Sequence, residues 1–146
     1  MASWKQFEEE APDLAKRVRA RFKWTKHHVL ATLRKDGSPR VSGTEVEFEP
    51  DDIFLGSMGG SRKARDLQRD PRFALHSNPG DGSMEGGDAK ISGTVEETTP
   101  HASHPGSHRF RMSIEEVVLT SLHPKGDRLL IETWKPGREV RRRERF

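Results

Sequence analysis

Short apolar runs that alternate with polar residues, each ended by a turn signal, are the feature that most limits how this chain can fold. His28–Leu33 and Arg40–Phe48 flank the segment Lys35–Pro39, whose Asp-Gly pair is typical of a β-hairpin turn. Five further runs with strand character follow: Ile53–Leu55, Arg72–Ser77, Ala89–Glu96, Phe110–Leu122 and Arg128–Trp134. Six or seven strands, mostly joined by short turns, predict a mainly β, α+β fold built on an antiparallel barrel.

Two segments predict helices that flank this barrel. Within residues 1–24, apolar side chains recur every three or four positions, and Pro12 is expected to divide the segment into two pieces. Residues 61–68 fit a short helix with Ser61 as its N-cap, and Pro71 follows the expected end. We found no internal repeat and no long linker, so we expect residues 1–146 to form a single domain.

Composition excludes several classes of chemistry. The chain has no cysteine, which removes disulfides, thiolate metal sites and cysteine nucleophiles, so redox chemistry would need a bound cofactor. No stretch approaches the roughly 20 apolar residues of a membrane span, and the first residues do not resemble a signal peptide. We therefore expect a soluble, cytoplasmic protein that does not interact with membranes.

The positive charge is concentrated at one end. The net charge is +3, and residues 135–146 contain six Lys or Arg against two Glu. Aromatic residues that could stack on bases are not interleaved with these arginines, so we expect no nucleic-acid partner. Two interpretations of the segment stay open: a solvated tail, and a strand that faces an anionic ligand.

Gly56–Arg65 is the segment most informative about function. Small residues end a strand there, and the following helix begins with Arg62 and Lys63, although the positive end of a helix dipole normally attracts acidic side chains. A bound phosphate over that helix start would compensate the two cations. The alternative is that both side chains extend into solvent. The segment matches neither a Walker loop nor a Rossmann loop.

From Leu30 to Leu75 the chain resembles the pyridoxamine 5′-phosphate oxidase-like FMN-binding proteins. In that family a Thr-x3-Asp-Gly-x-Pro hairpin leads to a strand that begins with Arg, a later strand ends in Ser or Thr ahead of Ser-Arg-Lys, and a helix ends in Asp/Asn-Pro-Arg. The matching residues are Thr32, Asp36-Gly37, Pro39, Arg40, Ser57, Ser61-Arg62-Lys63 and Asp70-Pro71-Arg72. The resemblance implies a split β-barrel that binds FMN between the two subunits of a homodimer.

The resemblance also implies which residues contact the cofactor. The side chains of Arg40, Ser57, Arg62 and Lys63 would hold the phosphate and ribityl chain, which suits the preference of phosphate for guanidinium groups and hydroxyls. Backbone atoms of two strands and side chains near the C-terminus would border the flavin. The predicted cofactor-binding residues are Arg40, Val41, Ser42, Gly56, Ser57, Ser61, Arg62, Lys63, Trp134 and Arg145.

The C-terminal segment departs from the oxidases proper at one position. In those enzymes an Arg-x-His pair binds the substrate. Here Arg141 matches the arginine, whereas Arg143 stands where the histidine is expected. We therefore expect Arg141 and Arg143 to bind an anionic small molecule, and we do not transfer oxidation of vitamin B6.

No side chain stands out as a general acid or base, so the catalytic residues stay unassigned. His101, His104 and His108 lie in a segment rich in Pro and Gly without cysteine, and we interpret them as solvent-facing and predict no metal site. The leading hypothesis is an FMN-dependent oxidoreductase. Two alternatives remain open: a reductase that uses an 8-hydroxy-5-deazaflavin coenzyme, suggested by the run Lys63–Leu67, and a non-catalytic flavin-binding protein.

Overall fold

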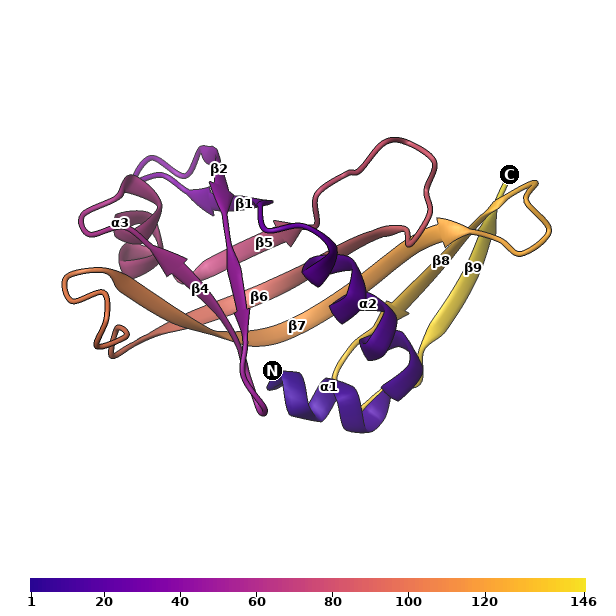
Figure 1. Ribbon diagram of the computed structural model, residues 1–146, viewed down its shortest axis with the longest axis horizontal. Coiled ribbons are helices and arrows are strands. Elements are labelled where there is room, and N and C mark those ends of the chain that lie inside the picture. The colour runs from indigo at the N-terminus through magenta and orange to yellow at the C-terminus, as the bar shows by residue number, and fades with distance from the viewer.

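The computed structural model describes residues 1–146 as three helices and nine strands (Figure 1). The helices are α1 (Trp4–Glu10), α2 (Pro12–Trp24) and α3 (Arg62–Arg69). The strands are β1 (His28–Leu33), β2 (Pro39–Thr44), β3 (Val46–Phe48), β4 (Ile53–Ser57), β5 (Arg72–His76), β6 (Asp88–Thr98), β7 (His108–Leu122), β8 (Leu129–Trp134) and β9 (Arg141–Arg145). None of the helices has the length and hydropathy needed to span a membrane.

All strand pairs are antiparallel, in the order β2-β1-β5-β6-β7-β4-β3, with β8 added to β7 and β9 added to β8. The sheet divides at β7, the longest strand. One edge of β7 pairs with β6 along most of its length, while the other edge pairs first with β4 and then with β8. The barrel is therefore split and not closed, which confirms the predicted α+β split-barrel class.

The strand count exceeds the six or seven that the sequence predicts, for two reasons. Arg40–Phe48 was expected to form one strand, but it is divided at Glu45 because β2 pairs with β1 while β3 pairs with β4, at the opposite end of the strand order. The arginine-rich end is also ordered as β9, which pairs with β8 over five residues. Its charged side chains hide the two-residue period of a strand from a hydrophobicity pattern.

The two N-terminal helices form one bent unit that covers the sheet. Pro12 occupies the first turn of α2, where its missing N–H is harmless, so the chain bends at Ala11 as predicted. Arg17 then anchors α2 to β8, with both terminal nitrogens of its guanidinium bound to the buried Glu132 carboxylate at 2.6 and 2.9 Å. A bidentate pair of this kind fixes orientation as well as distance.

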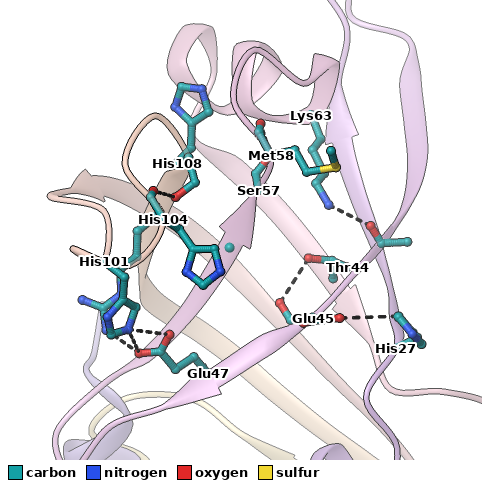
Figure 2. Close-up of a pocket in the computed structure, with 14 residues that line it drawn as sticks. His27, Thr44, Glu45, Glu47, Ser57, Met58, Lys63, His101, His104 and His108 are labelled. Carbon is teal, nitrogen blue, oxygen red and sulfur yellow. Dashed lines mark hydrogen bonds and ion pairs between the residues drawn. The ribbon is translucent and has the colours of Figure 1, made fainter.

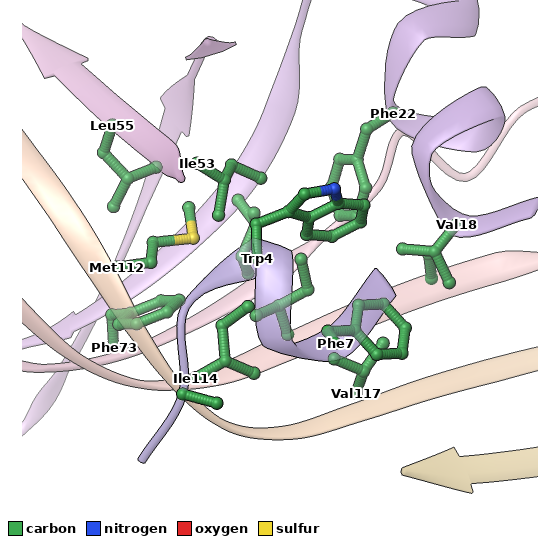
Figure 3. Packing of buried hydrophobic residues seen from close by; sticks show 14 of the residues in the cluster. Trp4, Phe7, Val18, Phe22, Ile53, Leu55, Phe73, Met112, Ile114 and Val117 are labelled. Atoms are coloured by element: carbon green, nitrogen blue, oxygen red, sulfur yellow. The ribbon is translucent and has the colours of Figure 1, made fainter. Parts of the chain in front are cut away.

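The core lies between these helices and the concave face of the sheet (Figure 3). The Trp4 ring meets Phe7 and Phe48 edge to face at 5.1 and 5.0 Å between centroids, and Phe7 lies 4.7 Å from Trp134. These large rings are completely or almost completely excluded from solvent, apart from Phe48. Aromatic contacts therefore fix the first helix against β3 and β8.

A β-bulge at Gly93 bends the long β6–β7 ladder. The register shifts between Ser92 and Gly93, and a Cβ atom at position 93 would lie 2.0 Å from the Ser113 carbonyl oxygen. The backbone of β7 is restrained on its other edge as well, because the next residue, Ile114, pairs with Ala2. Gly93 is thus a residue that the bend requires.

We predict that Gly93→Ala lowers the free energy of unfolding by more than about 3 kcal/mol, since a side-chain carbon would overlap the backbone of the neighbouring strand. Urea denaturation measures the change. Gly43→Ala is the matched control, because a Cβ there meets nothing within 4 Å, and it should change stability by less than about 1 kcal/mol. Equal effects of the two substitutions would contradict the role given to the bulge.

Candidate functional site

A cavity of about 490 Å³ opens at the end of the molecule where α3 begins (Figures 1 and 2). Strands β2, β3 and β4, the first turn of α3 and the segment 101–109 surround it. Its fourteen lining residues are His27, Gly43, Thr44, Glu45, Glu47, Gly56, Ser57, Met58, Lys63, His101, His104, Ser107, His108 and Arg109. Almost all of them are polar, charged or small, so the cavity suits a ligand rich in polar groups.

The turn from Gly56 to Ser61 leads into α3 as the sequence predicts. The Ser61 hydroxyl caps the helix by accepting a hydrogen bond from the Ala64 amide at 3.2 Å, and the Ser57 hydroxyl bonds to the Ser61 hydroxyl. The first turn of α3 contains no acidic residue and begins with Arg62 and Lys63. Free amides, two hydroxyls and two cations therefore meet at one point.

Lys63 lines the cavity, whereas the preceding Arg62 is exposed and is not among the lining residues. The Lys63 ammonium donates to the Gly43 carbonyl of β2 at 2.8 Å, which joins α3 to the far wall (Figure 2). Burial lowers the pKa of Lys63, against the opposing effect of the Glu45 charge. An anion beside the ammonium would offset the cost of this desolvation by charge attraction, so the side chain is well placed for a negative ligand.

A buried carboxylate fixes α3 against the β1–β2 hairpin. Asp66 accepts hydrogen bonds from the Thr32 hydroxyl at 2.8 Å, from Arg40 Nε at 2.7 Å and from Arg69 Nη2 at 2.9 Å. Burial alone would raise the pKa of Asp66, but the hydrogen bonds and the two arginine charges hold it below its usual value. The Asp66 carboxylate is thus ionised, and it is the contact that positions the helix start.

This arrangement assigns Arg40 a different place from the one expected. Its Nε atom is bound to Asp66, and its side chain lines a broad, open depression with Arg34 and Arg69 on another side of α3. It is not among the residues that line the cavity with Lys63. The Thr and Arg of the family motif therefore have a structural role here, which is to hold Asp66.

Histidines form the wall that faces Lys63: His101 and His104 are exposed to solvent, as we interpreted them, whereas His108 is half-buried. His101, His104 and His108 all line the cavity, and Figure 2 shows His101 and His104 across from Lys63. The segment that carries them returns over the α3 turn, and a Cβ at Gly59 would lie 2.4 Å from the Gly106 carbonyl oxygen. Only this long-range packing places the histidines, so nothing in their own sequence could have indicated it.

Glu47, Glu49 and His101 could together offer ligand atoms to a metal ion, since these atoms lie within 4.8 Å of one another. However, Arg109 supplies the positive charge in this cluster. Its Nη2 atom lies 2.7 Å from Glu47 and 3.5 Å from Glu49, and His101 contacts Glu47 at 3.1 Å. The cluster is best described as an ion-pair network that fastens the histidine segment to β3.

The structure leaves the C-terminal site residues apart from this cavity. Trp134 is completely buried against Phe7 in the core, so its indole cannot border a ligand in the cavity. Arg141, Arg143 and Arg145 are exposed on β9, at the opposite end of the molecule from α3 (Figure 1). They alternate with Arg142 and Glu144, which pair with Glu132 and Arg128, so the three lie on one face of the strand.

Of the predicted cofactor-binding residues, the structure gathers Gly56, Ser57 and Lys63 in the cavity wall, with Ser61 and Arg62 adjoining them. The strand β2 borders the same cavity through Gly43 and Thr44, while the neighbouring Ser42 is half-buried and Val41 is exposed. Most of the residues predicted to hold a phosphate therefore lie close together within one chain. The residues expected to border the ring are not.

Comparison with known proteins places this geometry in context. The family model described as "Pyridoxamine 5'-phosphate oxidase" matches residues 14–135. PhzG from Burkholderia lata 383, solved in complex with tetrahydrophenazine-1-carboxylic acid, is 15% identical, with a TM-score of 0.62 over 91% of this chain and 88% of its own. HutZ, the heme storage protein from Vibrio cholerae, is 14% identical, with a TM-score of 0.57 over 75% and 94%. An F420 reductase is 17% identical, with a TM-score of 0.52 over 63% and 88%.

We predict that Asp66→Asn lowers the free energy of unfolding by about 2–4 kcal/mol, because two arginines lose their buried carboxylate. Asp70→Asn, which removes a surface pair with Arg72, should cost less than about 1 kcal/mol. The lowered pKa of Asp66 means that its contribution is complete above the unfolded-state pKa and is lost as the pH falls through the folded-state pKa. Urea titrations at neutral and acidic pH should therefore show that the free energies of unfolding of the wild type and Asp66→Asn converge in acid. A difference between them that does not change with pH would contradict the assignment.

Proposed function

Because the chain belongs to the pyridoxamine 5′-phosphate oxidase family, we propose that it binds FMN at the start of α3 and acts as an oxidoreductase on an anionic small molecule. One observation carries the proposal: the first turn of α3 presents Arg62 and Lys63 at the positive end of the helix dipole, with no acidic residue to balance them. A phosphate dianion is the group that this arrangement would stabilise.

The residues around the turn fit a flavin phosphate. Ser57 and Ser61 offer hydroxyls, Lys63 offers a partly desolvated ammonium and Arg62 a guanidinium free to reach over the rim. Polar side chains and strand backbone then continue along the cavity, as the ribityl chain requires. The volume of about 490 Å³ is within the range of cofactor pockets, which is roughly 300–1,000 Å³.

The flavin ring needs an apolar surface that one chain does not supply in this cavity. Met58 is the only hydrophobic residue in the lining. The outer face of the sheet, by contrast, carries an apolar depression of about 360 Å³ at β1, β5, β6 and β7, formed in part by Val29, Ala31 and Val118. We propose that this face packs against a second copy of the chain and that the ring lies between the subunits.

A homodimer also accounts for the arginines of β9. Within one chain they lie at the opposite end from α3, so only those of a second chain can approach the cavity (Figure 1). Arg145 of that chain would then border the cofactor, and Arg141 and Arg143 would attract an anionic substrate, since none of the three forms an ion pair within the chain. Trp134 has no part in this proposal because it is a core residue.

When bound, FMN would supply hydride transfer. The protein's own residues would bind, orient and shield the cofactor. The α3 turn would fix the phosphate, and the backbones of β2 and β4 would set the direction of the ribityl chain. The histidine segment would cover one side of the cavity. His104 contacts Ser103 and otherwise faces the cavity, so it is the titratable group best placed to exchange a proton there.

A deazaflavin coenzyme is the second candidate, because an F420 reductase shares the fold. The run Lys63–Leu67 that suggested it is less specific than expected, since Asp66 and Leu67 are buried for structural reasons. The neighbour HutZ, described as a heme storage protein, adds heme as a third candidate. A flavin-binding protein without catalysis would use the same site.

The absorption spectrum of the purified protein separates these candidates. We expect the bands of oxidised flavin, retained through gel filtration at a mass of two chains. Tight binding of deazaflavin with no affinity for FMN would favour the second candidate, and a Soret band would favour heme. Reduction of the bound flavin by nicotinamide nucleotides, or its reoxidation by added acceptors, would distinguish an enzyme from a binding protein.

We predict that the double variant Arg62→Gln/Lys63→Gln weakens FMN binding about a hundredfold or more, because two charge-assisted contacts to phosphate are lost. Its melting temperature should stay within about 2 °C of the wild type. The variant loses the hydrogen bond from Lys63 to Gly43, but it also loses the repulsion between two cations and the positive end of the helix dipole. Fluorescence titration measures binding, and Lys16→Gln/Lys23→Gln on α2 is the charge-matched control. Unchanged affinity in the α3 variant would refute the site.

A further inference from the structure

We propose that Glu97 and His108 form a positioning pair that holds the Gly59–Gly60 turn, so that phosphate binding at the start of α3 requires a neutral His108. The phosphate half of this inference rests on the proposed function. The half that concerns the turn depends only on contacts within the chain, and the two can fail separately.

Three elements meet at His108, the first residue of β7. Its Nε2 atom lies 3.1 Å from the Gly60 amide nitrogen, and its Nδ1 atom lies 2.8 Å from the Glu97 carboxylate on β6. Gln68 of α3 donates to the other oxygen of that carboxylate at 2.9 Å. The imidazole thus connects β6, α3 and the turn through which the chain enters α3.

The contacts determine where the proton of the imidazole lies. A backbone amide is only a donor, so Nε2 must accept from Gly60 and cannot carry a proton. Nδ1 therefore carries it and donates to Glu97, an arrangement that a carboxylate neighbour favours. Hydrogen bonds from His108 and Gln68 lower the pKa of Glu97, so the carboxylate stays ionised as an acceptor.

The turn has few other restraints, which makes this one important. Gly60 adopts φ = 71°, a conformation suited to glycine, and the one backbone hydrogen bond across the turn joins the Ser61 amide to the Met58 carbonyl at 3.2 Å. Gly59 is pressed against the Gly106 carbonyl on its outer side. Because Ser61 follows directly as the N-cap of α3, a displacement of Gly60 moves the amides that would face the phosphate.

Glu97 is the charged group in contact with the imidazole, and α3 contributes only the uncharged Gln68. Lys63 and His104 line the same cavity, and Arg109, the next residue of β7, turns to Glu47. Protonation at Nε2 would place a second donor opposite the Gly60 amide and break that hydrogen bond. Acid should therefore release the turn and weaken phosphate binding.

FMN titrations at pH 7.5 and pH 5.5 test the functional half. Acid also converts part of a phosphate dianion to the monoanion, so the informative quantity is the ratio of the two dissociation constants in each variant. We expect this ratio to be about fivefold larger in the wild type than in His108→Gln, whose amide oxygen accepts from Gly60 at both pH values. His123→Gln removes another carboxylate-paired histidine, at the far end of the molecule, and should keep the wild-type ratio.

Equal ratios in the wild type and His108→Gln, or tighter binding of FMN by the wild type in acid, would overturn the requirement for neutral His108. The turn itself is followed by NMR without any cofactor. The Gly60 amide proton should shift during acidification with the same midpoint as the His108 ring, and it should not shift in this way in His108→Gln.

The two readouts separate the two claims. A Gly60 amide that does not follow His108 refutes the positioning pair, whatever the result with FMN. If the Gly60 amide follows His108 but the protein binds FMN at neither pH, the positioning pair is established and the proposed cofactor is refuted. The claim that phosphate binding requires a neutral His108 is then refuted as well.

Discussion

The buried carboxylate of Asp66 is the interaction on which the arrangement of the α3 end of this molecule depends. It receives hydrogen bonds from β1, from β2 and from its own helix, so the position of α3 is set by three donors instead of by a large apolar contact. An eight-residue helix with only Ala64 and Leu67 as buried apolar side chains could not be fixed by packing alone. The position of the α3 turn therefore derives from a polar contact on the opposite side of the helix.

The start of α3 carries charges that oppose its stability. Arg62 and Lys63 stand at the end of α3 where acidic residues would be more favourable, and Lys63 is partly desolvated as well. His108 and Ser61 bind main-chain N–H groups around the turn, so its shape is kept although its charge is unfavourable. The cost is confined to a few side chains that a ligand can compensate.

Local patterns in the sequence predict most of the elements because their causes are local. Ser61 and Pro12 mark helix starts, Asp36-Gly37 marks the hairpin, and the alternating runs become β1 and β4–β8. The division of Arg40–Phe48 and the pairing of β9 are decided by partners distant in the chain, and no local period encodes them. The same reason applies to the cavity. Ser57, Ser61 and Lys63 are close in sequence, so their proximity in space could be predicted. The histidine wall, the contacts of Arg40 and Asp66 and the burial of Trp134 depend on tertiary contacts.

Strand β9 leaves one edge of the sheet open, and its composition controls how copies of the protein can meet. An open edge offers unpaired N–H and C=O groups to any other strand, which is the usual route to fibrous polymers. If two β9 edges were brought together, Arg141, Arg143 and Arg145 of one copy would confront the same guanidinium groups of the other, with no acidic residue on that face to separate them. Electrostatic repulsion thus disfavours the pairing of two β9 edges, and the charge of the strand protects its open edge against self-polymerisation.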